Sequence, residues 1–366
     1  MNAKNPRTNI IRLFLPLSDQ EEIKEITRTI TSGFWASGEG TGKVKEFENK
    51  FSKYIGCNQV ISVNSGTAAL HLALSVSNVS KKEVLVPSLT FASTAHAAVY
   101  NNAKPKFVDI DESTLCIDID DLEKKITKNT KVVMPVHFGG YPCDLNSIKK
   151  IKNDYGLCVV EDAAHACGAK FANKKIGTHN ELVCFSFHPV KNLAMPIGGA
   201  IAVNGKKEKT KLLKSLRWCG ITDRKDGIYD IKQVGWNYYM NEISAAIGII
   251  QLKRLERMNR HRKQIAREYS RRLNVEHKMP FSQECSYHLY WIRVKNRKEF
   301  MNKMMNRGIE TGIHYKPVHL MKYYSNSGRL ENCEKIWREL VSLPMHANLS
   351  KYDVEKIITK TNEFAR

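Results

Sequence analysis

The stretch VISVNSGTAALHLALSV at residues 60–76 indicates the fold class of this chain. Its first four residues are rich in β-branched side chains, which predicts a short strand. The small residues at 64–66 predict a tight turn, and the apolar run after them predicts a helix. Residues 83–100, EVLVPSLTFASTAHAAVY, repeat the order of strand, loop and helix. This alternation predicts an α/β domain with a mostly parallel sheet covered by helices on both faces.

The same alternation continues along the chain. Further strands are expected at residues 106–109, 131–136, 158–161 and 200–203. Helices are expected at residues 19–32, 43–54, about 119–127 and 144–155. A long amphipathic helix at 241–273 precedes shorter strands and helices. We therefore expect a large domain at residues 1–250 and a small C-terminal domain at residues 251–366.

Basic residues outnumber acidic ones, 58 to 37, which gives a formal net charge of +21. A compositional bias toward lysine explains this charge, and the alternative is a nucleic-acid binder that uses the polar face of the long helix. That face contains Lys253, Arg254, Arg257, Arg260, Arg262, Lys263, Arg267, Arg271 and Arg272. The sequence has no zinc finger, no RRM motif and no basic zipper, so we expect a solvated basic face and no nucleic-acid partner.

Cysteine usage and hydropathy indicate a soluble protein in a reducing compartment. The chain has an odd number of cysteines, nine, and no two of them form a CxxC motif, which predicts buried free thiols. There is no run of 18 apolar residues, and the apolar stretch at 10–17 is interrupted by Arg12 and Pro16. We therefore expect a cytoplasmic protein with neither a signal peptide nor a membrane span.

Three segments place reactive residues just after a predicted strand, which is where such sheets bind ligands. The turn at 64–67, NSGT, could bind a phosphate through N–H groups at a helix start, although a plain tight turn is the commoner reason for such residues. Asp162, in EDAAH at 161–165, could accept a proton or a cation, or could simply cap the next helix. Lys191, in CFSFHPVKN at 184–192, could attack a carbonyl once an apolar pocket lowers its affinity for protons.

Other catalytic patterns are missing from the sequence. A Walker loop, HExxH, GxSxG and metal-ligand spacing are all absent, so we expect no metal, and His188 alone would more often be structural. The order of the three segments, with an aromatic residue after the second strand and Gly198-Gly199 after the lysine, favours an electron-sink cofactor. Such a cofactor needs a lysine for its aldehyde, a carboxylate for its pyridinium nitrogen, a phosphate cup and an aromatic cover.

These residues resemble the DegT-type family of nucleotide-sugar aminotransferases, which depend on pyridoxal 5′-phosphate (PLP) and have the aspartate-aminotransferase (type I) fold. The resemblance runs nearly from end to end. It is carried by VNSGTAALHLAL (63–74), VPSLTFASTAHA (86–97), PKFVDID (105–111), MPVHFGGYPCDL (134–145), VVEDAAHACGA (159–169), CFSFHPVKN (184–192), GWNYYMNEISAAIG (235–248) and GIETGIHYKPVHL (308–320).

The resemblance implies a large domain with a mostly parallel seven-stranded sheet and a small C-terminal α+β domain. It also implies PLP bound covalently to Lys191, with pyridoxamine phosphate as an intermediate. The implied reaction moves an amino group from an amino acid, with glutamate as the first candidate, to a nucleotide-linked 4-keto- or 3-keto-6-deoxy sugar. Such amino sugars usually serve surface glycan synthesis.

The resemblance assigns catalytic roles to Lys191, to Asp162 at the pyridinium nitrogen and to His165 near the phenolic oxygen of the cofactor. The residues that it implies in cofactor binding are Gly66, Thr67, Ala68, Phe91, Asp162, His165, Ser186, Lys191 and Asn237. Asn237 would reach the cofactor of a neighbouring subunit, which implies a homodimer with shared active sites. The residues that it implies near the substrate are Trp35, Ser37, His188, His314, Tyr315 and His319.

Two positions depart from the family pattern. Pro196-Ile197 stand where relatives usually have glycine and an acid, and Glu39-Gly40 stand where many have Gly-Pro. Lys191 disfavours the dehydratase branch, which has histidine at that position. The alternatives are another PLP reaction, such as a glycine-acetyltransferase-like or decarboxylase-like one, and a regulatory protein on the same fold.

Overall fold

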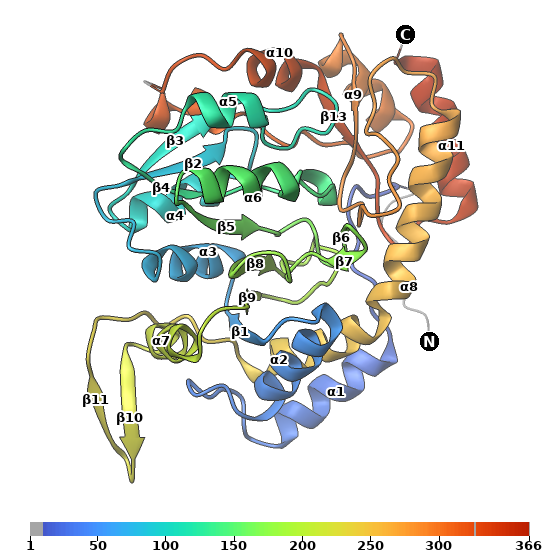
Figure 1. The fold of residues 1–366 in the computed structure, drawn as a ribbon. Helices are drawn as coiled ribbons and strands as arrows, with labels where there is room; N and C mark the ends of the chain where they lie inside the picture. Colours follow the sequence, from blue (N-terminus) through green and yellow to red (C-terminus); the bar gives the residue numbers. More distant parts are fainter. Residues whose placement is uncertain (1–9, 326, 366) are drawn as a thin grey trace.

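The fold is that of a computed structural model, which describes residues 10–325 and 327–365. At its centre lies a seven-stranded sheet of order β1-β9-β8-β5-β4-β2-β3, which runs from the bottom to the top of the view in Figure 1. The strands are β1 (Gln59–Val63), β2 (Glu83–Pro87), β3 (Lys104–Val108), β4 (Thr130–Val133), β5 (Cys158–Asp162), β8 (Leu182–Ser186) and β9 (Gly199–Val203). β9 is antiparallel to both of its neighbours and the other pairs are parallel, so the predicted mostly parallel sheet is confirmed.

Helices alternate with these strands along the chain, as the sequence pattern predicts. They are α1 (Gln20–Thr31), α2 (Gly42–Ile55), α3 (Gly66–Ser75), α4 (Ser93–Tyr100), α5 (Ile119–Lys124), α6 (Leu145–Asp154) and α7 (Lys207–Arg217). α3 packs on β8 and β9, whereas α4 packs on β3. Polar side chains begin several of these helices, because a side-chain oxygen satisfies a free N–H of the first turn. Asp19 does so at α1 and Ser65 at α3.

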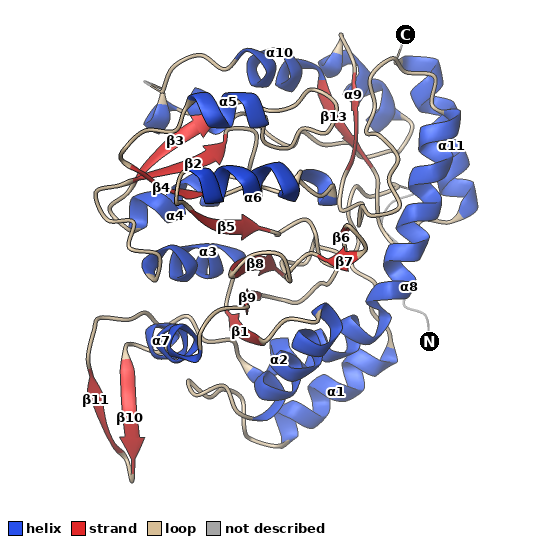
Figure 2. Ribbon diagram, in the orientation of Figure 1, coloured by secondary structure: helices blue, strands red, loops and turns tan. Residues whose placement is uncertain are grey.

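The C-terminal part begins with a long helix, contains a small two-stranded sheet of β12 and β13, and ends in another helix. It contains α8 (Glu242–Arg272), β12 (Tyr290–Arg293), α9 (Arg297–Asn306), the 3-10 turns η2 (Val318–Leu320) and η3 (Lys322–Tyr324), α10 (Glu331–Glu339), β13 (Leu340–Leu343) and α11 (Lys351–Phe364). α8 packs on α1 and α2 at one end and on α11 at the other (Figure 2). The boundary expected at residue 250 falls inside α8, and the division into two domains stays a prediction.

Small elements complete the described chain. They are η1 (Phe138–Gly140), β6 (Lys170–Phe171), β7 (Lys174–Lys175), β10 (Ile221–Lys225) and β11 (Ile228–Ile231). The hairpin β10–β11 projects from the body of the molecule in Figure 1 and exposes Ile228, Tyr229 and Ile231. β4 ends at Val133, earlier than the predicted residue 136, because Pro135 has no N–H to continue the ladder.

The basic face of α8 is only partly solvated, so the expectation was wrong for two arginines. Arg254 is buried and binds Asp19 at 2.7 Å and Glu22 at 3.0 Å. Arg262 is buried and donates to the carbonyl of Met345, and burial lowers its pKa to about 10. α8 is covered by other elements, so its basic positions meet carboxylates and carbonyls as well as water.

All nine cysteines are free, as the sequence predicts. Cys219 is exposed and Cys158 is half-buried, so the expected burial was wrong for these two. In the described ranges, no helix has the length and apolar character needed to cross a membrane. Within the same ranges, no group of three or more His, Cys, Asp and Glu side chains could hold a metal ion.

Candidate active site

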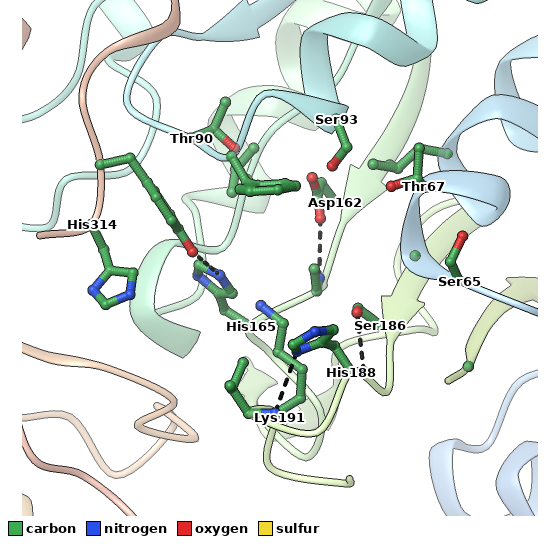
Figure 3. Close-up of a pocket in the computed structure, with 18 of the residues that line it drawn as sticks. Ser65, Thr67, Thr90, Ser93, Asp162, His165, Ser186, His188, Lys191 and His314 are labelled. Carbon is green, nitrogen blue, oxygen red and sulfur yellow. Dashed lines mark hydrogen bonds between the residues drawn. The ribbon is translucent and has the colours of Figure 1, made fainter. Parts of the chain in front are cut away.

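A cavity of about 370 Å³ lies where several strands of the central sheet end. Its walls come from the segments that follow β1, β2, β5 and β8, together with residues of the C-terminal part (Figure 3). The described residues that line it include Phe14, Ser65, Gly66, Thr67, Thr90, Phe91, Ser93, Asp162, His165, Ser186, His188, Lys191, Ile197, His314 and Tyr315. The structure therefore brings most of the cofactor residues expected from the sequence into one place.

The start of α3 forms one wall of the cavity. The Ser65 hydroxyl accepts the N–H of Ala68 at 3.1 Å, and Gly66 and Thr67 line the space. A Cβ on Gly66 would lie 2.7 Å from the Cβ of Ser186, so only glycine lets α3 approach β8 this closely. The N-terminal end of a helix attracts anions, so this wall fits a phosphate.

Asp162 is buried at the end of β5 and is held at both oxygens. Its Oδ2 accepts the hydroxyl of Thr94 at 2.8 Å, and its Oδ1 accepts the N–H of Ala164 at 3.1 Å. Burial raises the pKa of this carboxyl, whereas both hydrogen bonds favour the ionised form. The fixed carboxylate is suited to a cationic nitrogen in the cavity.

Lys191 projects into the same cavity as Asp162 (Figure 3). Burial lowers its pKa to about 8, while the charge of Asp162 opposes this effect. Its Nζ lies 3.4 Å from Nε2 of His288. A lysine with this proton affinity is partly unprotonated near neutral pH, which suits a nucleophile toward an aldehyde.

His165 is held as a neutral ring in one tautomer. Burial lowers its pKa well below the usual value. Its Nδ1 accepts the N–H of Gly139 at 3.2 Å, so the proton of the neutral ring lies on Nε2. Nε2 then donates to the hydroxyl of Tyr315 at 3.1 Å. This pair closes one side of the cavity.

Phe91 and two histidines complete the described walls. Phe91 is 60% exposed, and its ring is free to cover a planar group. His188 lines the space, and so does His314, which pairs with the hydroxyl of Ser342 at 2.9 Å. Burial lowers the pKa of His314 to about 4.

Five of the expected site residues do not line this cavity. They are Trp35, Ser37, Ala68, Asn237 and His319. Ala68 is buried, and its N–H donates to the hydroxyl of Ser65. His319 is buried between the hydroxyl of Ser88, 2.6 Å from its Nδ1, and the carboxylate of Glu334, 3.5 Å from its Nε2. Trp35 and Asn237 are exposed, and Ser37 is half-buried.

Sequence analysis missed several side chains at this site, among them Thr94, Phe14 and His288. Thr94 lies within a segment that carries the family resemblance, so it could have been noticed. Phe14 and His288 carry no local signal, because long-range pairing brings them to the site. Ile11 pairs with Ile309, and this pairing places the N-terminal segment beside the cavity.

These features fit PLP. Lys191 is suited to an electrophilic aldehyde, and the buried carboxylate of Asp162 is suited to a pyridine nitrogen. The start of α3 is suited to a phosphate, and Phe91 is suited to the face of a planar ring. The fold and the site are those of a PLP-dependent transferase of type I fold. Residues 16–362 match the DegT/DnrJ/EryC1/StrS aminotransferase family, and the chain belongs to this family. It is a PLP-dependent sugar aminotransferase.

Curated and solved relatives agree with this assignment. The chain is 32% identical to the spore coat polysaccharide biosynthesis protein SpsC of Bacillus subtilis, over 98% of both chains. A putative sugar aminotransferase of Streptococcus pneumoniae, Spr1654 in its PMP form, has a TM-score of 0.92 and 28% identity, over 97% of this chain and 98% of that one. PseC of Helicobacter pylori, an aminotransferase of pseudoaminic acid biosynthesis, has a TM-score of 0.92 and 26% identity, over 98% of this chain and 99% of that one.

Proposed function

We propose that this protein transfers the amino group of an amino acid, with glutamate as the first donor to test, to a nucleotide-linked keto sugar. The observation that carries the proposal is that Lys191 and the buried Asp162 line one cavity with the start of α3. The name of SpsC, a spore coat polysaccharide biosynthesis protein, supports a sugar substrate that ends in a surface glycan. The net charge of +21 would attract a diphosphate-bearing substrate.

Each residue of the site has a defined task in this proposal. PLP, when bound, supplies an electron sink for the carbon that bears the amine. Lys191 holds the cofactor at rest and, once released by the donor, moves a proton as base and then as acid. Asp162 keeps a proton on the ring nitrogen, and Thr94 keeps Asp162 ionised and oriented. Ser65, Gly66, Thr67 and Ser186 are suited to the phosphate, and Phe91 to the ring face.

The same cavity offers His188 and His314 to the substrate. Both lie on its wall, and the chain contributes no arginine to the described lining. A donor carboxylate or a sugar hydroxyl would therefore meet imidazole nitrogens from this subunit. His165 and Tyr315, joined by their hydrogen bond, are suited to the phenolic oxygen of the cofactor.

We further propose a homodimer in which Asn237 serves the cofactor of the other subunit. Asn237 is exposed and lies off the cavity of its own chain. The exposed apolar side chains of the hairpin β10–β11, among them Ile228 at 77%, would find cover in such a dimer.

The first experiment locates the cofactor and the donor. The absorbance spectrum of the protein with PLP is recorded before and after glutamate, and borohydride reduction followed by peptide mapping identifies the modified lysine. We expect PLP on Lys191, a spectral change with glutamate, and neither in Lys191→Ala. Product formation is then measured with a panel of nucleotide keto sugars. PLP on another lysine, or no amino sugar from any member of the panel, would contradict the proposal.

The second experiment tests shared sites by complementation. Lys191→Ala and Asn237→Ala are each expected to be nearly inactive. Mixing them under conditions that exchange subunits should restore about a quarter of the wild-type activity, because half of the dimers are mixed and each mixed dimer has one intact site. If the mixture stays as inactive as its components while native mass spectrometry with one variant mass-tagged shows mixed dimers, the sites are not shared in this way.

A further inference from the structure

His288 is a buried histidine that touches the active-site lysine from behind the cavity wall. Its Nε2 lies 3.4 Å from Nζ of Lys191, and its side chain is 1% exposed. The ring of Phe14 stacks on it with centroids 5.4 Å apart and planes at 15°. The ring of His165 lies 4.5 Å away, also between centroids. The imidazole therefore cannot turn away from Lys191 without moving both neighbours.

The backbone around His288 is tied to the site on two sides. The N–H of Ser286 donates to the carbonyl of Gly140, and the N–H of Leu289 donates to the carbonyl of Gly139, both at 3.1 Å. Asn192, the residue after the lysine, donates its amide to the carbonyl of Ser286 at 2.8 Å. Positions 191 and 288 are thus fixed relative to each other by hydrogen bonds on either side.

The surroundings of Nδ1, the other ring nitrogen of His288, indicate which atom donates in the hydrogen bond between Nε2 and Lys191. Within the described residues, Nδ1 of His288 is buried and has no partner. If Nε2 accepted from Lys191, the ring proton would sit on Nδ1 as a buried N–H with no acceptor. If Nε2–H donates to the lone pair of an unprotonated Nζ, Nδ1 is only an unused acceptor. Buried orphan N–H groups are rarer in proteins than unused acceptors, so the second arrangement is favoured.

We propose that His288 is a positioning residue, whose Nε2–H donates to the lone pair of Lys191 Nζ and so holds this lysine as a free amine aimed into the cavity. The inference rests on the proposed function, in which Lys191 is released and moves a proton. The proposal adds His288 as the group that keeps the released Lys191 unprotonated, so that Nζ can accept that proton.

The proton balance is simple. Nζ of free Lys191 forms an N–H bond with the proton that leaves the α-carbon of the donor, and the electrons of the broken C–H bond stay with the substrate carbon. The lone pair of Nζ is then used, so the hydrogen bond from His288 is released. It forms again when Lys191 gives the proton up. His288 gains and loses no proton in either step.

The charges around the pair agree with a neutral imidazole. Burial lowers the pKa of His288 well below its usual value, and the charge of Lys191 acts in the same direction. The other titratable groups that act on this pair or line the cavity around it are Asp162, His165, His188, Arg262, His314 and Tyr315. Asp162 alone among them favours the ammonium form of Lys191, so a donor to the free amine offsets its effect.

The test measures the pKa of Lys191 directly in full-length protein without PLP, a form in which the relative Spr1654 has been solved. Trace acetylation over a pH series, read by mass spectrometry of the Lys191 peptide, gives the pKa, with the other lysines as internal references. His288→Phe keeps a ring between Phe14 and His165 but removes the donor. We expect the pKa of Lys191 to rise by about 1, the effect of one hydrogen bond. His288→Gln, which restores an N–H, should return it part of the way.

His179→Phe is the matched control, because Nε2 of His179 donates to the carbonyl of Phe171 at 3.0 Å and the residue lies off the cavity. Circular dichroism confirms that each variant is folded, and His288→Gln keeps the test open if the Phe variant is not. In the PLP-loaded enzyme, the acidic limb of the kcat profile with glutamate should move to higher pH in His288→Phe, with little change in KM.

An unchanged or lower pKa of Lys191 in His288→Phe would overturn the proposal, and so would an equal rise in both His288 variants. Failure of the proposed function has a different signature, since borohydride mapping would then place PLP on another lysine. The acetylation result does not depend on where PLP binds.

Discussion

Thr94 donates its hydroxyl hydrogen to Oδ2 of Asp162 at 2.8 Å, across 68 residues of sequence. The bond joins the start of α4 to the end of β5, so the β2–α4 unit orients the carboxylate that β5 provides. The hydroxyl of Thr90 in turn lies 2.8 Å from that of Thr94. Thr94, which sequence analysis did not single out, therefore fixes the orientation of the predicted Asp162 carboxylate.

Thr94→Val should lower kcat/KM for the donor half-reaction by about tenfold or more, since a hydrogen bond to a charged group contributes about 2 kcal/mol. Asp162 loses a donor that favours its ionised form, so its pKa, already raised by burial, should rise further. The acidic limb of the pH–rate profile then moves to higher pH. Thr94→Ser keeps the hydroxyl and should behave like the wild type. Equal pH–rate profiles for the Val and Ser variants would show that the hydrogen bond from Thr94 affects neither the pKa of Asp162 nor the rate.

The central sheet and the core of the site could be predicted because their signals are local. The strand ends at 63, 162 and 186 each lie beside their functional residues in sequence, so the motif and the geometry coincide. A small residue at 66, an acid at 162 and a lysine at 191 can be recognised without any knowledge of what packs against them.

The rest of the site depends on contacts between distant segments. His288 reaches Lys191 only because its segment pairs with Gly139 and Gly140, and nothing in the sequence around residue 288 marks that pairing. Asp109 is a similar case. Its carboxylate accepts the N–H groups of Asn332 and Cys333 at 2.9 and 2.8 Å, which caps α10 from 223 residues away. Short-range capping rules cannot find such a partner.

His314 and His319 were both expected near the substrate, and the structure separates them. His314 lines the cavity, whereas His319 is buried between Ser88 and Glu334. His314→Asn should reduce kcat/KM for the substrate by about tenfold and leave stability nearly unchanged. His319→Asn should instead lower the free energy of unfolding by about 1–3 kcal/mol, because it disturbs a buried hydrogen bond. Steady-state kinetics and urea unfolding of both variants test these two roles. A loss of stability in His314→Asn together with a loss of activity alone in His319→Asn would contradict the assignment.

A buried ion pair supports the loop that carries Ser37 to Gly40. Arg217 binds Glu48 at 2.7 Å, and its other nitrogen donates to the carbonyl of Glu39 at 3.0 Å. Arg217→Met alone should lower the free energy of unfolding by about 3–5 kcal/mol, because it leaves the carboxylate of Glu48 buried without its partner. The double variant Glu48→Leu/Arg217→Met should be more stable than Arg217→Met in urea unfolding. If it is less stable, the carboxylate of Glu48 is sufficiently stabilised in Arg217→Met by the N–H and hydroxyl of Ser62, and the expected penalty is wrong.

Lys191 should make the protein without PLP less stable than it would be with an apolar residue there. Its pKa is about 8 in the folded chain against a reference value of 10.5, so the unfolded chain binds more protons between these two pH values. Stability therefore rises with pH across that window, and the full cost of burying the ammonium is present below pH 8. A difference of this size corresponds to about 3 kcal/mol.

Lys191→Met should accordingly raise the free energy of unfolding at pH 7 by up to about 3 kcal/mol, and the gain should shrink as the pH approaches 10.5. Urea unfolding of both proteins without PLP at pH 7 and pH 10 measures the difference, in which groups common to both cancel. A gain that is equal at the two pH values would mean that the methionine only packs better. A gain that falls with pH would show that the site keeps its lysine reactive at the expense of stability, as a nucleophile for an aldehyde requires.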